Sequence, residues 1–217
     1  MSDRKRNKKT GGFSVIELII TMVIVLIVLG LATSLFSKSL GVRQRESSHT
    51  DALTAAQAAL NVMSREISNA GYGLKNTAGT DPSNGIVLAD STTQKLHFLS
   101  NIQNSNVVAT DRDENVTYFY DSASQSILRY DANANGANSS ETSIIINRIS
   151  SVSFLYFDYV GSSSTPTQSN TPSENTGRVR VTITVALENV QGQPINRSVV
   201  LTSDVTLRNA NYMLNQY

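Results

Sequence analysis

The stretch FSVIELIITMVIVLIVLGLATSLF, residues 13–36, decides the architecture of this chain. Its 24 residues contain a single charged side chain, that of Glu17. A helix needs about 20 apolar residues to cross the hydrocarbon core of a bilayer, so this run is long enough to span it. The sequence therefore predicts a transmembrane helix over residues 13–36.

The charge of the chain is concentrated before this run. Residues 1–12 hold five Lys and Arg against one Asp, a balance of +4, whereas the whole chain has a net charge of +1. The remainder is therefore −3. Because a basic flank stays on the cytoplasmic side, we expect a single pass through the membrane, with residues after Phe36 outside the cytoplasm.

Two ordinary explanations of the apolar run fit it poorly. A secretory signal peptide has an apolar core of about 7–15 residues followed by a small-residue cleavage site, and residues 13–36 are too long for that class. A plain membrane anchor fits the length. It does not explain Glu17, because a carboxylate inside a membrane span is costly and usually has a partner and a task.

The segment KTGGFSVIELI, residues 9–19, resembles the processing site of type IV prepilins. The shared features are a short basic leader, Gly12 before the cut, Phe13 at the new N-terminus and Glu17 five residues into the mature chain. The resemblance implies that a prepilin peptidase cleaves between Gly12 and Phe13 and that the Phe13 amine is N-methylated. It also implies that Glu17 pairs with the Phe13 amine of a neighbouring subunit and sets the register of assembly.

Apolar periodicity continues beyond the membrane run, over residues 37–70. Positions spaced alternately by four and three residues form one helical face, which is mostly apolar from Leu53 onward. We expect one helix from about Phe13 to about Ala70, ended by the glycines that follow it. A two-helix coiled coil is the alternative. The face consists of Val42, Glu46, His49, Leu53, Ala56, Leu60, Met63, Ile67 and Ala70.

Residues 71–217 are predicted to form a β-rich head. Segment 178–187 (RVRVTITVAL) alternates apolar and polar residues, as a half-buried strand does. Residues 190–194 (VQGQP) are typical of a hairpin turn, and residues 161–177, which lack apolar content, are predicted to be a mobile surface loop. The fold class is α+β, with the long helix packed on an antiparallel sheet as in pilin heads. The other predicted strands are 85–89, 95–100, 115–120, 126–130, 143–147, 152–160 and 198–208.

Two further segments resemble one branch of the pilin family. SREISNAGYG (64–73), and RVRVTITVAL (178–187) followed by LTSDVTLRNAN (201–211), are similar to the corresponding parts of PilW-type minor pilins and of J-type pseudopilins. Many members of that branch have cysteines in the head, whereas this chain has none. Disulfides and thiolate metal sites are therefore excluded.

No catalytic constellation is recognisable, so the chain is not expected to be an enzyme or to need a cofactor. Asp131, Asn133 and Asn135 match the opening of a calcium-binding loop, but Thr142 stands where a bidentate Glu is required. We therefore favour a polar turn over a calcium site. His49 and His97 lie far apart in the sequence, and neither is given a metal or catalytic role.

The resemblance implies a minor pilin that helps to prime a type IV pilus. Its expected partners are the prepilin peptidase, the other minor pilins, the major pilin and the pilus assembly platform. Its expected location is the inner membrane, with the head in the periplasm, and then the filament at the cell surface. Two alternatives remain open: a J-type pseudopilin of a type II secretion system, and an adhesin or other binding module displayed on a pilus. Nucleic acid is not an expected partner, because the mature chain is net negative and has no dense basic patch.

Overall fold

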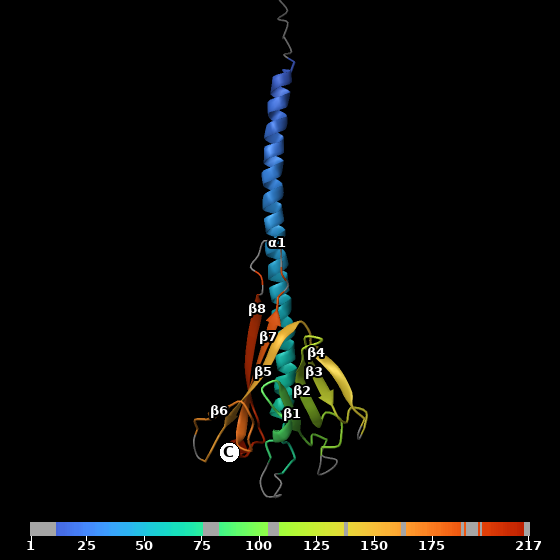
Figure 1. The fold of residues 1–217 in the computed structure, drawn as a ribbon, viewed down its shortest axis with the longest axis vertical. Helices are drawn as coiled ribbons and strands as arrows, with labels where there is room; N and C mark the ends of the chain where they lie inside the picture. Colours follow the sequence, from blue (N-terminus) through green and yellow to red (C-terminus); the bar gives the residue numbers. More distant parts are fainter. Residues whose placement is uncertain are drawn as a thin grey trace, which may run out of the picture.

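A single helix dominates the molecule (Figure 1). The computed structural model describes residues 12–75, 83–103, 109–136, 139–161, 164–187, 189, 195 and 197–214. Helix α1 (Val15–Ser68) has 54 residues. At 1.5 Å per residue it is about 80 Å long, and its first half extends away from the head as a free stalk.

The two halves of α1 differ in burial. Every side chain from Phe13 to Leu40 is exposed, and the helix contains a segment long and apolar enough to cross a membrane. Burial begins at Ala56 and continues through Leu60, Met63 and Ile67. The predicted apolar face is therefore confirmed where the head covers the helix. Val42 and Glu46, in the same face, are exposed because they lie where the head leaves the helix uncovered.

The described residues of the head form two four-stranded antiparallel sheets, where the sequence predicted one. The first has the order β1-β2-β3-β4 and the second the order β6-β5-β7-β8. The first sheet is a meander throughout, because each strand pairs with the next one in the chain. The second departs from this order at one place, where β5 pairs with β7 as well as with β6. The strands are β1 (Lys95–Leu99), β2 (Asn115–Asp121), β3 (Ser126–Asp131), β4 (Glu141–Ile146), β5 (Ile149–Asp158), β6 (Thr167–Ser169), β7 (Thr176–Ala186) and β8 (Ser198–Thr206).

One hydrophobic core joins the helix to both sheets. Alternate residues of the strands point inward, as the pleat of a sheet requires. The polar side chains of α1 reach both sheets: Glu66 accepts a hydrogen bond from Tyr118 of β2 at 2.7 Å, and Ser64 lies 3.2 Å from Ser203 of β8. The largest core side chains are Tyr118, Tyr156, Phe98, Phe154, Met63, Ile67, Leu96, Ile127, Ile149 and Ile183.

The end of α1 is held against the first sheet by two glycines. Gly71 and Gly85 both have positive φ, 77° and 75°. Their backbones pass so closely that a Cβ on Gly71 would lie 2.0 Å from the carbonyl oxygen of Ser83. The Gly71 N–H donates to the Leu99 carbonyl at 2.8 Å, so the helix end is hydrogen-bonded directly to β1.

The α+β class, with a long helix on antiparallel sheets, is confirmed, and the architecture is consistent with a pilin fold. The predicted strand 85–89 is wrong: Ile86 makes one isolated bridge to Phe98, and Leu88–Asp90 is a short 3-10 helix, η1.

Two further elements depart from the prediction. The segment 161–177, predicted to be a loop, contains β6 and the first residues of β7. A short C-terminal helix, α2 (Asn211–Leu214), was not predicted. The predicted turn at 190–194 lies outside the described residues.

Candidate functional site

The start of α1 is fixed by a capping box. Ser14 is the N-cap, with extended backbone dihedrals of −71° and 142°. Its Oγ accepts from the Ile16 N–H at 3.4 Å, and the Ser14 N–H donates to Oε2 of Glu17 at 3.0 Å. Such reciprocal bonds satisfy N–H groups that have no partner inside the helix.

Glu17 therefore has a local role in addition to the assembly role predicted for it. Its carboxylate lies in the first helical turn, where a negative charge interacts favourably with the helix dipole. Among the contacts of the described residues, one carboxylate oxygen is used by the Ser14 N–H and the other, Oε1, has no hydrogen-bond partner. The S-x-x-E pattern at residues 14–17 was present in the sequence as a signal for this cap, and the sequence analysis did not use it.

The predicted cleavage point lies just outside the helix. Gly12 and Phe13 are exposed and belong to no helix or strand, and Phe13 is 87% exposed. Helical structure begins only at Val15. A protease can therefore reach the Gly12–Phe13 bond without unwinding α1. Residues 1–11, the rest of the predicted leader, lie outside the described residues.

The apolar half of α1 is not covered by any other part of the chain that the structure describes. No residue of its most apolar 18-residue segment is buried in the head, and large side chains such as Leu18, Val25 and Leu35 are 54–68% exposed. A continuous apolar surface of this size is stable only in a membrane or against other apolar helices.

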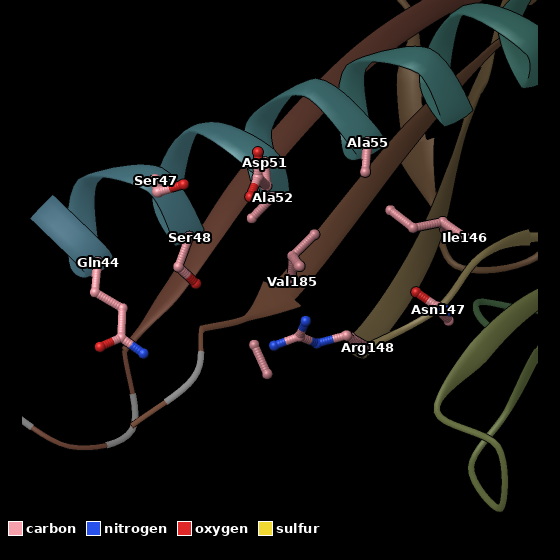
Figure 2. Close-up of a pocket in the computed structure, with 11 residues that line it drawn as sticks. Gln44, Ser47, Ser48, Asp51, Ala52, Ala55, Ile146, Asn147, Arg148 and Val185 are labelled. Carbon is pink, nitrogen blue, oxygen red and sulfur yellow. The ribbon is translucent and has the colours of Figure 1, made fainter. Parts of the chain in front are cut away.

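A hollow of about 380 Å³ opens where α1 leaves the head (Figure 2). Ser48 and Asp51 contribute from the helix, and Arg148 and Val185 from the opposite side. Figure 2 shows Arg148 extending toward the helix, across the same space that Gln44 and Ser48 face. The hollow lies at the end of the head nearest to the apolar half of α1, a position that another subunit or the membrane surface would approach.

A charged cluster that the sequence did not reveal joins α1 to the first sheet. Glu66 accepts from the Tyr118 hydroxyl at 2.7 Å and from Nε of Arg129 at 2.9 Å. Arg129 also donates to Asp113 at 2.6 Å and lies 3.5 Å from Asp131. Burial, together with the Glu66 carboxylate, raises the pKa of Tyr118 above its ordinary value, so this hydroxyl stays a donor at neutral pH.

This cluster uses the leading residue of the calcium-loop candidate. Asp131 is buried, and its two oxygens accept from the backbone N–H groups of Asn133 and Asp113. Asn133 in turn donates to the Ala109 carbonyl at 3.1 Å. The carboxylate thus already has protein partners, which favours a structural turn. Within the described residues no group of three His, Cys, Asp or Glu side chains could hold a metal ion. The preference for a polar turn over a calcium site stays an untested prediction.

The two histidines lie in different surroundings. His49 is half-buried on α1. His97 is on β1, where its ring nitrogens lie 2.9 Å from Asp90 and 2.8 Å from Asn115. These contacts could not be predicted from the sequence, because the approach of His97 to Asn115 depends on the pairing of β1 with β2.

Comparison with known proteins identifies the N-terminal segment. Residues 7–33 match the family described as the prokaryotic N-terminal methylation motif. No curated protein matches the chain. The matched segment contains Gly12, Phe13 and Glu17 together with most of the apolar run. The motif supports a type IV pilin-like or pseudopilin protein that a prepilin peptidase processes, and over these residues the chain is similar to the prepilin-like proteins that carry it.

Proposed function

We propose that this chain is a minor pilin. In this proposal a prepilin peptidase cleaves the chain between Gly12 and Phe13, the Phe13 amine is methylated, and the mature protein joins a type IV pilus through α1. The observation that supports it most is the methylation motif together with the bare apolar helix that it overlaps. That helix needs a membrane before assembly and neighbouring apolar helices after it.

The cap geometry supports the step from cleavage to assembly. Cleavage leaves a positive amine at Phe13, next to the positive end of the helix dipole, which is unfavourable for an isolated subunit. In a bundle of apolar helices with little water, that amine and the Glu17 carboxylate each need an opposite charge. Glu17 Oε1 has no partner among the described residues and can accept the amine of a neighbouring subunit.

The head favours a minor over a major subunit. It contains two sheets, and it is longer than the head of a compact major pilin. The segments 64–73, 178–187 and 201–211 resemble the corresponding parts of PilW-type proteins. In this role the head contacts other minor pilins, the helix contacts the major pilin, and the assembly platform inserts the subunit as growth is primed. A J-type pseudopilin of a type II secretion system is the second candidate, because the same motif and helix serve both machines.

Intact mass of the membrane-extracted protein, with and without a co-expressed prepilin peptidase, tests the pathway. The expected result is loss of residues 1–12 and gain of one methyl group on Phe13, only when the peptidase is present. Gly12→Leu is the matched variant, which should block cleavage without disturbing the helix, because nothing lies within 4 Å of a Cβ at this position. An unprocessed chain in both samples overturns the proposal.

The two machines are distinguished by where the mature chain is found. Recovery with sheared surface filaments supports a type IV pilus. Retention in the cell envelope together with loss of enzyme secretion when the gene is deleted supports the pseudopilin alternative.

A further inference from the structure

A second hollow lies on the face of the first sheet that points away from α1. Tyr118 points to the helix, where it bonds Glu66, so its neighbours Thr117 and Phe119 point to the opposite face. Strand register places Lys95 and His97 beside Phe119 and Thr117, and Tyr130 beside Thr117, on that same face. The hollow has a volume of about 590 Å³, within the range of small-molecule sites.

One wall of the hollow is a chain of polar side chains held in fixed positions. Asp90 accepts from Lys95 Nζ at 2.5 Å and lies 2.9 Å from Nδ1 of His97. The other ring nitrogen of His97 is 2.8 Å from Asn115 Oδ1. The chain spans η1, β1 and β2. It is therefore ordered before any ligand arrives, which lowers the entropy cost of binding.

The hollow is nearly neutral. Lys95 and Asp90 are the two fully charged side chains that line it, and they pair with each other. Nucleic acid requires uncompensated cations, so it does not suit this surface. A peptide that adds a strand would use a free sheet edge, whereas this hollow lies on the face of the sheet.

Unused hydrogen-bonding groups converge on the same space. Within the part of the chain that the structure describes, the side chains of Gln94, Thr117 and Tyr130 and the Asn115 Nδ2 have no hydrogen-bond partner. They offer donors and acceptors of several kinds, namely amides and hydroxyls. Such groups can bind vicinal hydroxyls of a ligand.

Two aromatic rings complete the surface. Phe119 and Tyr130 are half-buried and line the hollow from adjacent strands. Because Thr117 pairs with Tyr130, Phe119 is the diagonal neighbour of Tyr130, at the roughly 7–8 Å spacing of such pairs. Their apolar faces suit the C–H face of a pyranose ring, while the amides and hydroxyls suit its edge.

We propose that this hollow is a binding site for a neutral glycan. The inference rests on the near-neutral, ordered polar wall, the unused amides and hydroxyls, and the two half-buried aromatic rings, and it does not depend on how the chain is assembled. On a filament, the site would add recognition of a carbohydrate to a structural subunit.

Saturation-transfer NMR on the full chain tests this site. The protein is held in an amine-oxide detergent, because maltoside detergents would compete, and is mixed with lactose, cellobiose, maltose or diacetylchitobiose. We expect transfer to the ring C–H protons of at least one of these sugars. Tyr130→Ala and Asn115→Ala should each weaken its binding by about tenfold. Tyr72→Ala, a half-exposed tyrosine outside the hollow, should leave binding unchanged.

Two results overturn the proposal. One is no transfer to any of the four sugars at millimolar concentration, and the other is binding that both hollow variants retain at full strength. Circular dichroism confirms that each variant is folded, and the two substitutions at separate positions protect the test against the misfolding of one. Intact mass of the same samples reports processing, so failure of the glycan site and failure of the pilin proposal are read independently.

Discussion

Gly71 and Gly85 allow the backbone that follows α1 to pack closely against the backbone of the head. Both lie in the left-handed region; a Cβ on Gly71 would meet the Ser83 carbonyl oxygen, and a Cβ on Gly85 would meet the backbone nitrogen of Gly71. The contact explains why the segment after the helix contains glycines, beyond their general tendency to end helices.

Gly71→Ala is therefore expected to destabilise the head strongly. The new Cβ would meet the Ser83 carbonyl at 2.0 Å, and the positive φ is unfavourable for alanine. We expect the free energy of unfolding to fall by about 3 kcal/mol or more, measured by urea titration followed by circular dichroism. Gly41→Ala is the matched control. No atom lies within 4 Å of its added Cβ, so this change should not destabilise the head. It should stabilise the helix itself by about 1 kcal/mol.

The Glu66 cluster is the second test at the scale of single residues. Glu66→Ala removes the α1 carboxylate that pairs with the largely buried Arg129. It should lower the free energy of unfolding by about 2–3 kcal/mol. Tyr118→Phe removes one hydrogen bond and should cost about 1 kcal/mol. Because both changes break the same bond, the double variant should lose less than the sum. Strictly additive losses would contradict the cluster.

At the scale of elements, β7 and β8 show how a regular strand pair is stabilised on its outer face. Arg180 donates to Asp204 of the facing strand through two nitrogens, at 2.6 and 2.9 Å. The next facing pair on the same side of the sheet, two residues along each strand, is Thr182 and Thr202, whose hydroxyl oxygens lie 3.2 Å apart. Such cross-strand pairs help to fix the register that the hydrophobic alternation sets.

This pair predicts an acid-sensitive contribution to stability. The Arg180 hydrogen bond holds the pKa of Asp204 below its ordinary value of 3.8. The unfolded chain therefore binds the proton more tightly, so the stabilisation is present above about pH 4 and is lost as pH falls through the lowered pKa. Asp204→Asn should reduce the melting temperature at pH 7 by a small amount, since both partners are partly exposed. The difference from wild type should shrink at pH 3. An equal difference at both pH values would contradict this account.

Elements were predictable from the sequence wherever alternation or helical periodicity was strong. The long helix and strands β2, β3, β7 and β8 follow from such patterns, because each buries one face. The segment 85–89 failed because its apolar residues serve a close backbone crossing and a 3-10 turn. Strand β6 was missed because its three residues are polar and pair only at a sheet edge.

The pairing of strands and side chains was less predictable than the type of each element. Alternation indicates that a strand has a buried face but does not say which sheet it joins, so two sheets were predicted as one. The cluster of Glu66, Tyr118 and Arg129 was not predicted for the same reason. Tyr118 and Arg129 lie 52 and 63 positions from Glu66 in the chain, and only the packing of the helix on the sheet brings them together. The residues predicted for cleavage and register, in contrast, lie close together within residues 12–17, so the motif can be recognised in the sequence directly; their roles stay predictions.

At the scale of the whole molecule, one continuous helix has an exposed apolar first half and a second half that the head covers. Because α1 is continuous from Val15 to Ser68, a force or a register fixed at its N-terminus reaches the head through a single element. The assembly proposal therefore depends on what happens at Glu17, about 80 Å from the far end of the helix.

Glu17→Gln separates the two roles of this side chain. Glutamine can still accept the Ser14 N–H bond, as capping boxes with Gln do, so the helix should begin normally and the chain should be cleaved and methylated. The variant cannot supply the charge that a neighbouring Phe13 amine needs in an apolar bundle. We therefore expect its recovery in filaments to fall by at least about tenfold, measured by mass spectrometry of sheared pili. Glu46→Gln, an exposed change on the same helix, should assemble normally. If the Glu17→Gln chain is processed and recovered at the wild-type level, Glu17 acts in assembly only as a cap, and register must come from the packing of the helices.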